Sequence, residues 1–317
     1  MASKQDQHQH QQLAPISWDE LDKRKFFVLM PMMFLGVRAA VYPSTLVKTR
    51  LQVQSKTSPL YTGAFDAFRK IARQEGVKGL YKGFGANTAV LFTSNVYVSV
   101  YELARKQVLT RTQLSEKAAN FAGGACASLA SQTLIVPLDI VSQHMMLTGQ
   151  GADVYGTRAR GIVAVAKRVY QLEGLRGFYR GYLPSIATYA PSSAIMWGSY
   201  GFLAPLYSSQ LSSWGIADPF WTQVISQALS GASAGFITAV STNPMDIVRT
   251  RAQVYTQYGA VDTLKYILQR DGVRGLMTGV SARVLTSAPF GLLAFSSYEL
   301  VKSVSWKSPQ EELVIAN

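Results

Sequence analysis

The feature that most constrains this chain is a proline motif that occurs three times, each time at the end of a long apolar segment. The copies read Pro-Ser-Thr-Leu-Val-Lys-Thr-Arg at 43–50, Pro-Leu-Asp-Ile-Val-Ser at 137–142 and Pro-Met-Asp-Ile-Val-Arg-Thr-Arg at 244–251. An acid-glycine pair follows each copy, with the acids at positions 75, 173 and 271, so that 98 residues separate each from the next. A long fixed period indicates one structural unit that is used three times.

Composition places these units in a membrane. The 317 residues are 48% hydrophobic and only 15% charged, whereas soluble proteins carry about 25% charged residues. Charge-free runs at 118–138, 181–217 and 219–245 are long enough for the roughly 20 residues that cross a bilayer. Ser, Thr, Asn and Gln interrupt the runs, and such polar groups must face protein or water. The sequence therefore predicts helices around a wet cavity.

The order of motifs predicts the same three elements in each repeat. A first crossing helix, kinked at its proline, covers about 26–54, 116–146 and 219–254. A short amphipathic helix then lies along the membrane surface at 64–74, 162–172 and 261–269. A second crossing follows Gly83, Gly181 or Gly279. The predicted fold is an all-α membrane protein with six transmembrane helices in three repeats and short surface helices.

These elements divide the chain into repeats at 21–110, 111–210 and 211–305, with polar tails at 1–20 and 306–317. The N-terminal tail has no apolar core, so it is no signal peptide, and a disordered tail is favoured over metal binding by His8 and His10. Cys126 is the only cysteine, which excludes an internal disulfide and a thiolate metal site; we expect it to be a small buried packing residue.

The net charge of +13 favours anionic lipid headgroups as partners over nucleic acid, because the basic residues lie between apolar runs rather than in one patch. No metal site, cofactor or enzyme activity is expected. His144 has no neighbouring cysteine or carboxylate that would form a catalytic pair, and Gly83-x-Gly85 is a lone fragment without the strand that a nucleotide site needs.

The triplicated motifs resemble those of the mitochondrial carrier (solute carrier 25) family. The shared pattern is Pro-x-(Asp/Glu)-x-x-(Lys/Arg)-x-(Lys/Arg), then acid-Gly and aromatic-basic-Gly, over residues 22–303. The resemblance implies a threefold pseudosymmetric six-helix barrel with surface helices on the matrix side. It implies a monomer in the mitochondrial inner membrane that moves small molecules by alternating access. It also implies lipid contacts, including cardiolipin at the helix starts of Gly83, Gly181 and Gly279.

Within the family, residues 38–54, 136–144 and 242–246 are most similar to carriers of branched-chain amino acids. The principal alternative to transport is a membrane adapter that recruits other proteins, as some relatives do. Such adapters tend to lose the charged gate signatures, which this chain keeps in part.

In the family, the acid two residues after the proline and the base five residues after it pair between repeats and close the matrix side. Thr45 replaces the acid of repeat 1 and Ser142 replaces the base of repeat 2. Glutamines four residues after two of the bases are placed to hydrogen-bond across the pairs, whereas repeat 2 has Met146 there. The predicted matrix gate comprises Lys48, Gln52, Asp139, Asp246, Arg249 and Gln253.

The charges decide the direction of pairing around the ring. If each acid meets the base of the next repeat, the pairs are Asp139–Arg249 and Asp246–Lys48, and the two neutral positions face each other. The opposite direction leaves Asp246 and Arg249 without charged partners. Because an unpaired buried charge is costly, we predict the first direction, which is also that of the family.

The cytoplasmic gate resembles the family motif (Phe/Tyr)-(Asp/Glu)-x-x-(Lys/Arg) in repeats 1 and 3. Its residues are Glu102, Arg105, Glu299 and Lys302. Repeat 2 has Gly201 and Ala204 in the charged places, so the same ring direction leaves one bridge, Glu299–Arg105. One bridge in a wet mouth contributes about 1 kcal/mol, and we expect a weak lock that interconverts easily.

Substrate contacts in the family lie seven residues after the glycine that opens each second crossing. These positions are Val90, Thr188 with Tyr189 beside it, and Thr286. The count in repeat 1 is uncertain by one residue, because that repeat is one residue short. None of the positions is basic, which disfavours nucleotides and tricarboxylates, since several anionic groups need several cations. Arg283 is interpreted as either a cavity cation or a structural arginine.

Arg38 is the strongest candidate for the substrate's carboxylate. It lies five residues before Pro43, and the equivalent Gln132 and Ala239 are uncharged. An arginine inside a membrane must face water or a partner, and its planar guanidinium suits a carboxylate. Beside Arg38 we expect apolar contacts from Val90, Tyr189, Trp197 or Phe290, and an ammonium site at Asn95, Thr188 and Thr286. This set predicts leucine, isoleucine and valine, with another small monocarboxylate or keto acid as the alternative.

Overall fold

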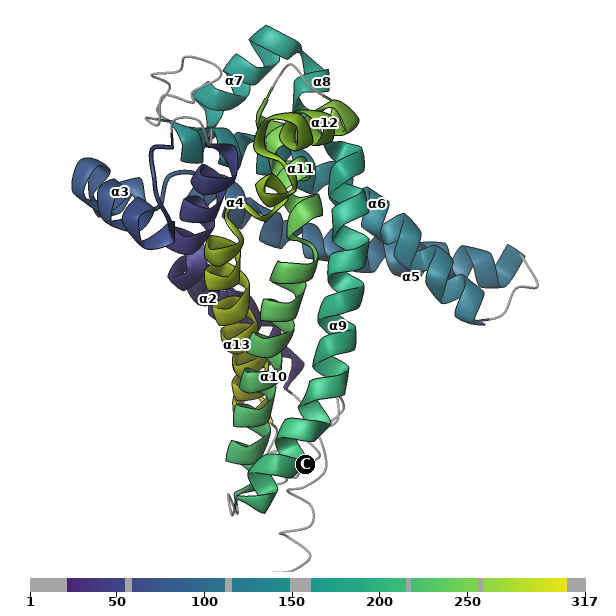
Figure 1. Cartoon of the computed structure of the whole chain (residues 1–317). Coiled ribbons are helices and arrows are strands. Elements are labelled where there is room, and N and C mark those ends of the chain that lie inside the picture. Colours follow the sequence, from purple (N-terminus) through teal and green to yellow (C-terminus); the bar gives the residue numbers. More distant parts are fainter. Residues whose placement is uncertain are drawn as a thin grey trace, which may run out of the picture. The chain divides into compact units, whose positions relative to one another are not determined.

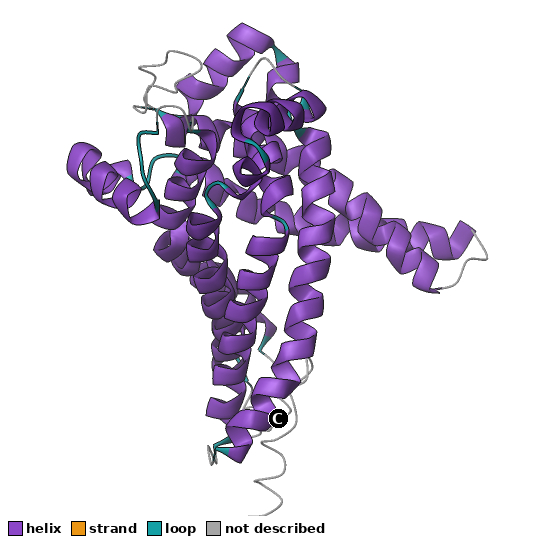
Figure 2. Ribbon diagram, in the orientation of Figure 1, coloured by secondary structure: helices purple, strands orange, loops and turns teal. Residues whose placement is uncertain are grey.

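The computed structural model describes residues 22–54, 59–111, 116–148, 161–214, 218–255 and 259–306. Every regular element in these ranges is a helix (Figure 2). The predicted tails, apart from residue 306, lie outside the described residues, and His8 and His10 lie outside them as well.

The helices follow the predicted plan of each repeat (Figure 1). The proline motifs lie on α2 (Lys23–Val53), on α6 (Glu116–Leu147) and on α10 (Pro219–Ser241) with α11 (Asn243–Val254). The surface helices are α3 (Ala64–Gly79), α7 (Ile162–Glu173) and α12 (Ala260–Asp271). The second crossings are α4 (Phe84–Ala89), η2 (Val90–Phe92) and α5 (Thr93–Arg111), then α9 (Tyr182–Ser213), then α13 (Val280–Val304). Two short helices, α8 (Leu175–Phe178) and η3 (Val273–Met277), precede the last two crossings.

Only one of the three prolines coincides with a break in its helix. Helices α2 and α6 continue through Pro43 and Pro137, whereas repeat 3 breaks at Thr242 and restarts as α11 with Pro244 in its first turn. A proline costs little there, because its missing N–H group would have no helical partner anyway. The three repeats thus differ in whether the helix is interrupted at its proline, and the kinks expected at Pro43 and Pro137 stay predictions.

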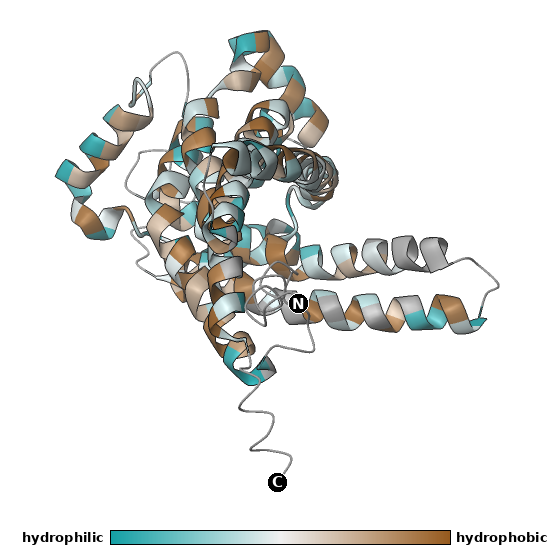
Figure 3. Cartoon of the chain, turned by 90° about the horizontal axis from the view of Figure 1, so that it is seen from below, coloured by the Kyte–Doolittle hydropathy of each residue, from teal (hydrophilic) through white to brown (hydrophobic). Residues whose placement is uncertain are grey.

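Three described helical stretches are long and apolar enough to cross a membrane: Arg24–Val53, Phe220–Ser241 and Val273–Val304. Helices α6 and α9 have 32 residues each, so they are also long enough. Their hydropathy is lowered by interspersed polar residues, and Figure 3 shows hydrophilic and hydrophobic residues mixed along the helices. Cys126 on α6 is exposed, which corrects the prediction of a buried cysteine; exposure in a membrane helix permits contact with lipid.

The chain forms two compact units. The first comprises Met1–Val41, Ile195–Ile237 and Ser287–Asn317. Its helices α10 and α13 cross with their backbones in contact at Gly231 and Gly291. There is no room for a side chain at this crossing, since a Cβ atom on Gly291 would lie 2.1 Å from the Gly231 carbonyl oxygen. Aromatic rings on α2 pack against α13 in the same unit, with Phe26 and Tyr298 in an edge-to-face contact at 6.2 Å. The two glycines thus allow the helices to approach closely.

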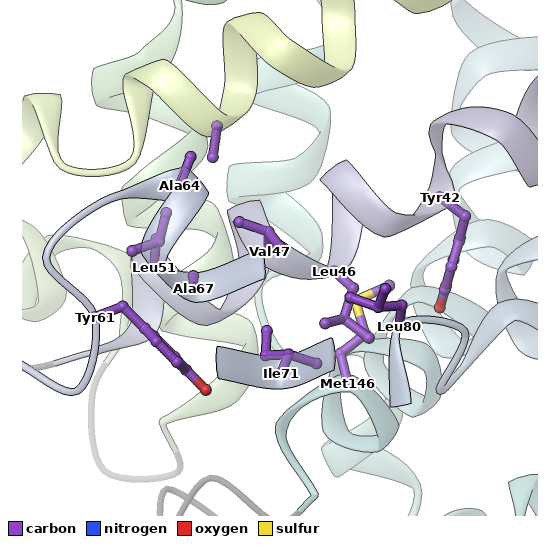
Figure 4. Packing of buried hydrophobic residues seen from close by; sticks show 11 residues of the cluster. Tyr42, Leu46, Val47, Leu51, Tyr61, Ala64, Ala67, Ile71, Leu80 and Met146 are labelled. Carbon is purple, nitrogen blue, oxygen red and sulfur yellow. The ribbon is translucent and has the colours of Figure 1, made fainter. Parts of the chain in front are cut away.

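The second unit comprises Tyr42–Ala194 and Thr238–Thr286. Figure 4 shows its largest apolar cluster, in which Leu46 and Leu51 of α2 contact Ala67 and Ile71 of α3. In a second apolar cluster, α7 packs against α4 and α6. Burial of such side chains contributes about 1.5–3 kcal/mol for each large one. Two of the surface helices are therefore held against the helix that carries the proline motif of the same repeat.

The three proline-motif helices converge at their ends. Val53, Leu147 and Val254 each lie ten residues after their proline, are almost fully buried, and form one cluster with Tyr255 packed against it. The threefold repeat of the sequence thus becomes a threefold contact in space. This contact positions the charged residues of the three helices, which lie one to three turns earlier.

Candidate transport gate and substrate site

The two charged pairs of the predicted matrix gate are in contact. Lys48 Nζ lies 2.7 Å from Asp246 Oδ2, and Arg249 Nη2 lies 2.5 Å from Asp139 Oδ2. Residues three positions apart share a face of a helix, so Asp246 and Arg249 both face inward from α11 and pair with different repeats. Each acid therefore meets the base of the next repeat, which is the direction that the unpaired-charge argument favours.

The two pairs differ in burial. The side chains of Lys48 and Asp246 are 19% and 6% exposed, whereas those of Arg249 and Asp139 are 22% and 16% exposed. Ions taken further out of water depend more strongly on their partners. Asp246, the least exposed of the four side chains, therefore depends most strongly on its partners.

Only one of the two glutamines hydrogen-bonds to a charged residue of the gate. Gln52 Nε2 donates to Asp246 Oδ2 at 3.0 Å, which is the predicted contact with the acid, but Gln52 Oε1 accepts from Thr250 at 3.1 Å and not from Lys48. The prediction for Gln253 was wrong. Its Nε2 donates to Ser185 at 3.1 Å and its Oε1 accepts from Gln143 at 2.7 Å, because a neighbouring amide and hydroxyl satisfy both ends of its side chain.

Arg283 joins the gate from the first turn of α13. Its Nε lies 3.5 Å from Asp246 Oδ2, and its Nη2 donates to Thr242 Oγ1 at 2.7 Å. Thr242 also accepts a hydrogen bond from Ser192 at 3.1 Å. The sequence left Arg283 open between a cavity cation and a structural arginine, and its position beside Asp246 was not predicted.

The acid-glycine signatures are ion-paired in all three repeats. Glu75 accepts from Arg50 at 2.6 and 3.0 Å and from Lys82 at 2.6 Å. Burial raises the pKa of the Glu75 carboxyl, but the hydrogen bonds and charges of Arg50 and Lys82 outweigh this effect and hold the pKa below its usual value. These pairs fasten each surface helix to its repeat. The equivalents are Glu173 with Arg180 and Asp271 with Arg251.

Two of these arginines also connect neighbouring repeats. Arg50 Nε donates to the Met146 carbonyl at 2.8 Å, and Arg251 Nε donates to the Gln52 carbonyl at 2.9 Å. The equivalent position in repeat 2 holds His144 instead of arginine. Sequence reasoning missed these contacts, although a base seven residues after the proline and a later acid recur together in repeats 1 and 3. That recurrence is the signal that could have found them.

The glycines that open α9 and α13 are required by close contact with the gate glutamines. Gly181 and Gly279 have φ angles of 69° and 77°, which favour glycine. A Cβ atom would lie 2.7 Å from Cγ of Gln253 at Gly181 and 3.0 Å from Cγ of Gln52 at Gly279. Each second crossing thus begins directly against the next repeat's proline-motif helix.

The predicted substrate contacts are divided between the two units. Arg38 and the exposed Trp197 belong to the first, and the Trp197 ring meets Phe295 at 5.7 Å. Val90, Thr188, Tyr189 and Thr286 belong to the second. Thr188 is buried, and its hydroxyl donates to the Pro184 carbonyl at 2.7 Å; the Thr286 hydroxyl likewise donates to Ala282 at 2.9 Å.

Four predicted side chains lie outside what the structure describes. Asn95, Glu102, Arg105 and Glu299 have described backbones only. The Glu299–Arg105 bridge and the role of Lys302 therefore stay predictions.

Comparison with known proteins identifies the class to which this arrangement belongs. The sequence profile of the mitochondrial carrier protein family matches residues 35–112, 115–211 and 220–309. Solute carrier family 25 member 44 of Mus musculus is 41% identical over 302 residues, which cover 92% of this chain and 94% of that protein. The Homo sapiens relative is 40% identical over the same length. Mitochondrial substrate carrier family protein J of Dictyostelium discoideum is 27% identical over 332 residues, with 92% of this chain and 94% of that protein covered.

The chain belongs to the mitochondrial carrier family. This membership confirms the family, the all-α carrier fold and the location in the mitochondrial inner membrane as a multi-pass protein. Members of the family transport small molecules across that membrane.

Proposed function

We propose that this carrier moves the branched-chain amino acids leucine, isoleucine and valine across the inner membrane by alternating access. The observation that carries the proposal is the chemistry of the contact positions, where Val90, Thr188 and Thr286 supply apolar and hydroxyl groups but no charge. Arg38 supplies one cation for one carboxylate. The resemblance of residues 38–54, 136–144 and 242–246 to carriers of branched-chain amino acids supports the same substrates.

The matrix gate supplies the barrier in this mechanism. The contacts of Asp246 with Lys48 and of Asp139 with Arg249 correspond to the state that is closed toward the matrix. Substrate then enters from the cytoplasmic side, and both pairs separate when the carrier opens inward. On the cytoplasmic side, one bridge between Glu299 and Arg105 closes the mouth. The carrier acts as a monomer, with cardiolipin at the helix starts of Gly83, Gly181 and Gly279.

Uptake into liposomes tests the substrate. Purified protein should take up labelled leucine, isoleucine and valine in preference to ADP, and the matching keto acids should be measured in parallel. Arg38→Ala should abolish uptake while the protein remains folded, and Arg38→Lys should keep part of it, because the charge remains but the planar fork is lost. Arg24→Ala is the matched control, since Arg24 lies on the same helix and is exposed.

Unimpaired leucine uptake by Arg38→Ala would remove Arg38 from the site. Preference for nucleotides would overturn the substrate class. Preference for keto acids would retain the single-carboxylate site and change its occupant. Absence of uptake for every compound would favour the adapter.

A further inference from the structure

Arg283 has an unused hydrogen-bonding group in a buried place. The residue is 7% exposed, its Nη2 is bound by Thr242 and its Nε faces Asp246. Its Nη1 is buried and, among the described residues, has no acceptor within hydrogen-bonding distance. Buried polar groups are normally satisfied, and a guanidinium donor without an acceptor is costly. The unused Nη1 therefore marks a place that an acceptor from outside the described chain would fill.

The charges around Arg283 specify that acceptor. The second unit brings three cations, Lys48, Arg249 and Arg283, to two carboxylates, Asp139 and Asp246. The cluster thus has one excess positive charge in the part of the chain that the structure describes. One carboxylate balances it, whereas a phosphate, with close to two negative charges at pH 7, would exceed it. The hydroxyls of Thr242 and Ser192 next to the guanidinium are neutral.

We infer that Arg283 is a second carboxylate-binding residue, in addition to Arg38, and that it receives the substrate's carboxylate at the closed matrix gate. This inference rests on the proposed transport of a monocarboxylate. It has a consequence for the gate, because Asp246 Oδ2 faces three donors, namely Lys48, Gln52 and Arg283. A carboxylate bound at Nη1 shares the single positive charge of the guanidinium with Asp246, which faces Nε, and so weakens the attraction of Arg283 for Asp246. Occupancy then weakens one contact of the gate acid and favours opening.

The test compares leucine with leucinol, which keeps the side chain and the amine but has no carboxylate. For wild-type liposomes, each compound is titrated as an inhibitor of labelled leucine uptake. We expect leucine to bind about 100-fold more tightly than leucinol. In Arg283→Gln the affinity for leucine should fall about 10-fold to 100-fold and that for leucinol should stay unchanged, because of the two compounds only leucine has a carboxylate that accepts the charged hydrogen bond. Arg283→Lys should recover part of the difference, and Arg69→Gln, an exposed change on α3, should leave it intact.

A residue that only braces Asp246 would change the uptake rate and leave the ratio of the two affinities as in the wild type. That result, in a variant with a normal thermal unfolding transition, would overturn the inference. If Arg283→Gln does not fold, the ratio in Arg283→Lys decides, since the lysine keeps the charge beside Asp246.

A binding assay separates this inference from the identity of the substrate. If wild-type protein does not take up leucine, the proposed function fails, and thermal unfolding with leucine, 4-methyl-2-oxopentanoate and 4-methylpentanoate tests Arg283 alone. At least one carboxylate should raise the unfolding temperature of the wild type but not of Arg283→Gln. No shift with any carboxylate, or equal shifts in both proteins, would overturn the assignment of Arg283.

Discussion

Replacing Asp246 with asparagine should destabilise the closed carrier more than the matching change at Asp139. The Asp246 carboxylate is 6% exposed and faces Lys48, Gln52 and Arg283 at 2.7, 3.0 and 3.5 Å. The Asp139 carboxylate is 16% exposed, and its partner Arg249 is 22% exposed. The first change leaves two cations without their carboxylate, and the second leaves one that is closer to water.

These differences set the expected magnitudes. Removal of one partner from a buried ion pair costs about 3–5 kcal/mol, and removal from an exposed pair costs about 1 kcal/mol or less. The Asp139 pair lies between these limits, at about 1–2 kcal/mol by interpolation. The two variants should therefore differ by about 2 kcal/mol, which corresponds to roughly 30-fold in an equilibrium constant. At about 2 °C per kcal/mol for a chain of this size, Asp246→Asn lowers the unfolding midpoint by about 6–10 °C and Asp139→Asn by about 2–4 °C.

The assay is thermal unfolding of detergent-solubilised protein, followed by the fluorescence of its five tryptophans. A double-mutant cycle with Lys48→Gln isolates the pair, since residues in contact show non-additive effects. The double variant should be less damaged than the sum of the two single variants. The reasoning is refuted if Asp139→Asn lowers the midpoint as much as Asp246→Asn, or if Lys48→Gln and Asp246→Asn are additive.

Two further variants test other contacts. Glu75→Gln should lower the unfolding midpoint at pH 7. The pKa of Glu75 is lowered in the folded protein, so its stabilising contribution is present above the unfolded-state pKa of about 4.3 and is lost as the pH falls through the folded-state pKa. The difference in unfolding midpoint between wild type and Glu75→Gln should therefore close at acidic pH. A difference that is independent of pH would contradict the role of ionised Glu75. Gly291→Ala should prevent stable folding, because its Cβ would lie 2.1 Å from the Gly231 carbonyl oxygen, whereas Gly36→Ala, with nothing within 4 Å, should be tolerated; equal effects of the two would argue against the backbone contact of α10 and α13.

The sequence could predict those parts of the molecule that repeat. The surface helices α3, α7 and α12 begin within one residue of their predicted starts, because an amphipathic period is a local property. The pairing of Asp246 with Lys48 also followed from the sequence, since charge leaves only one ring direction with full pairing. Three occurrences of the motif predicted which repeats pair with each other, which a single occurrence would not.

The contacts that break the symmetry were not predictable in the same way. Gln253 had the spacing of a bridging glutamine, but a spacing identifies the helix face and not the partner. Its amide is satisfied by Gln143 and Ser185, which have no counterpart in the motif. Arg283 illustrates the same limit, because its contact with Asp246 depends on how far the start of α13 reaches across α11, and no pattern within either segment encodes that distance.

The short 3₁₀ helix η2 has a consequence for how equivalent positions are matched between the repeats of this carrier. From Gly83 to Glu102 there are 19 residues, but from Gly279 to Glu299 there are 20. Three residues of 3₁₀ helix rise about 6 Å, as do four residues of α-helix, so η2 (Val90–Phe92) restores the axial length that the missing residue removes. An alignment gap therefore belongs within 90–92. Positions up to Val90 are therefore counted from Gly83, and positions beyond η2 are counted back from Glu102. Counting back from Glu102 to find the equivalent of Thr286 would give Ala89 instead of Val90, and a substitution there would test a different face of the helix.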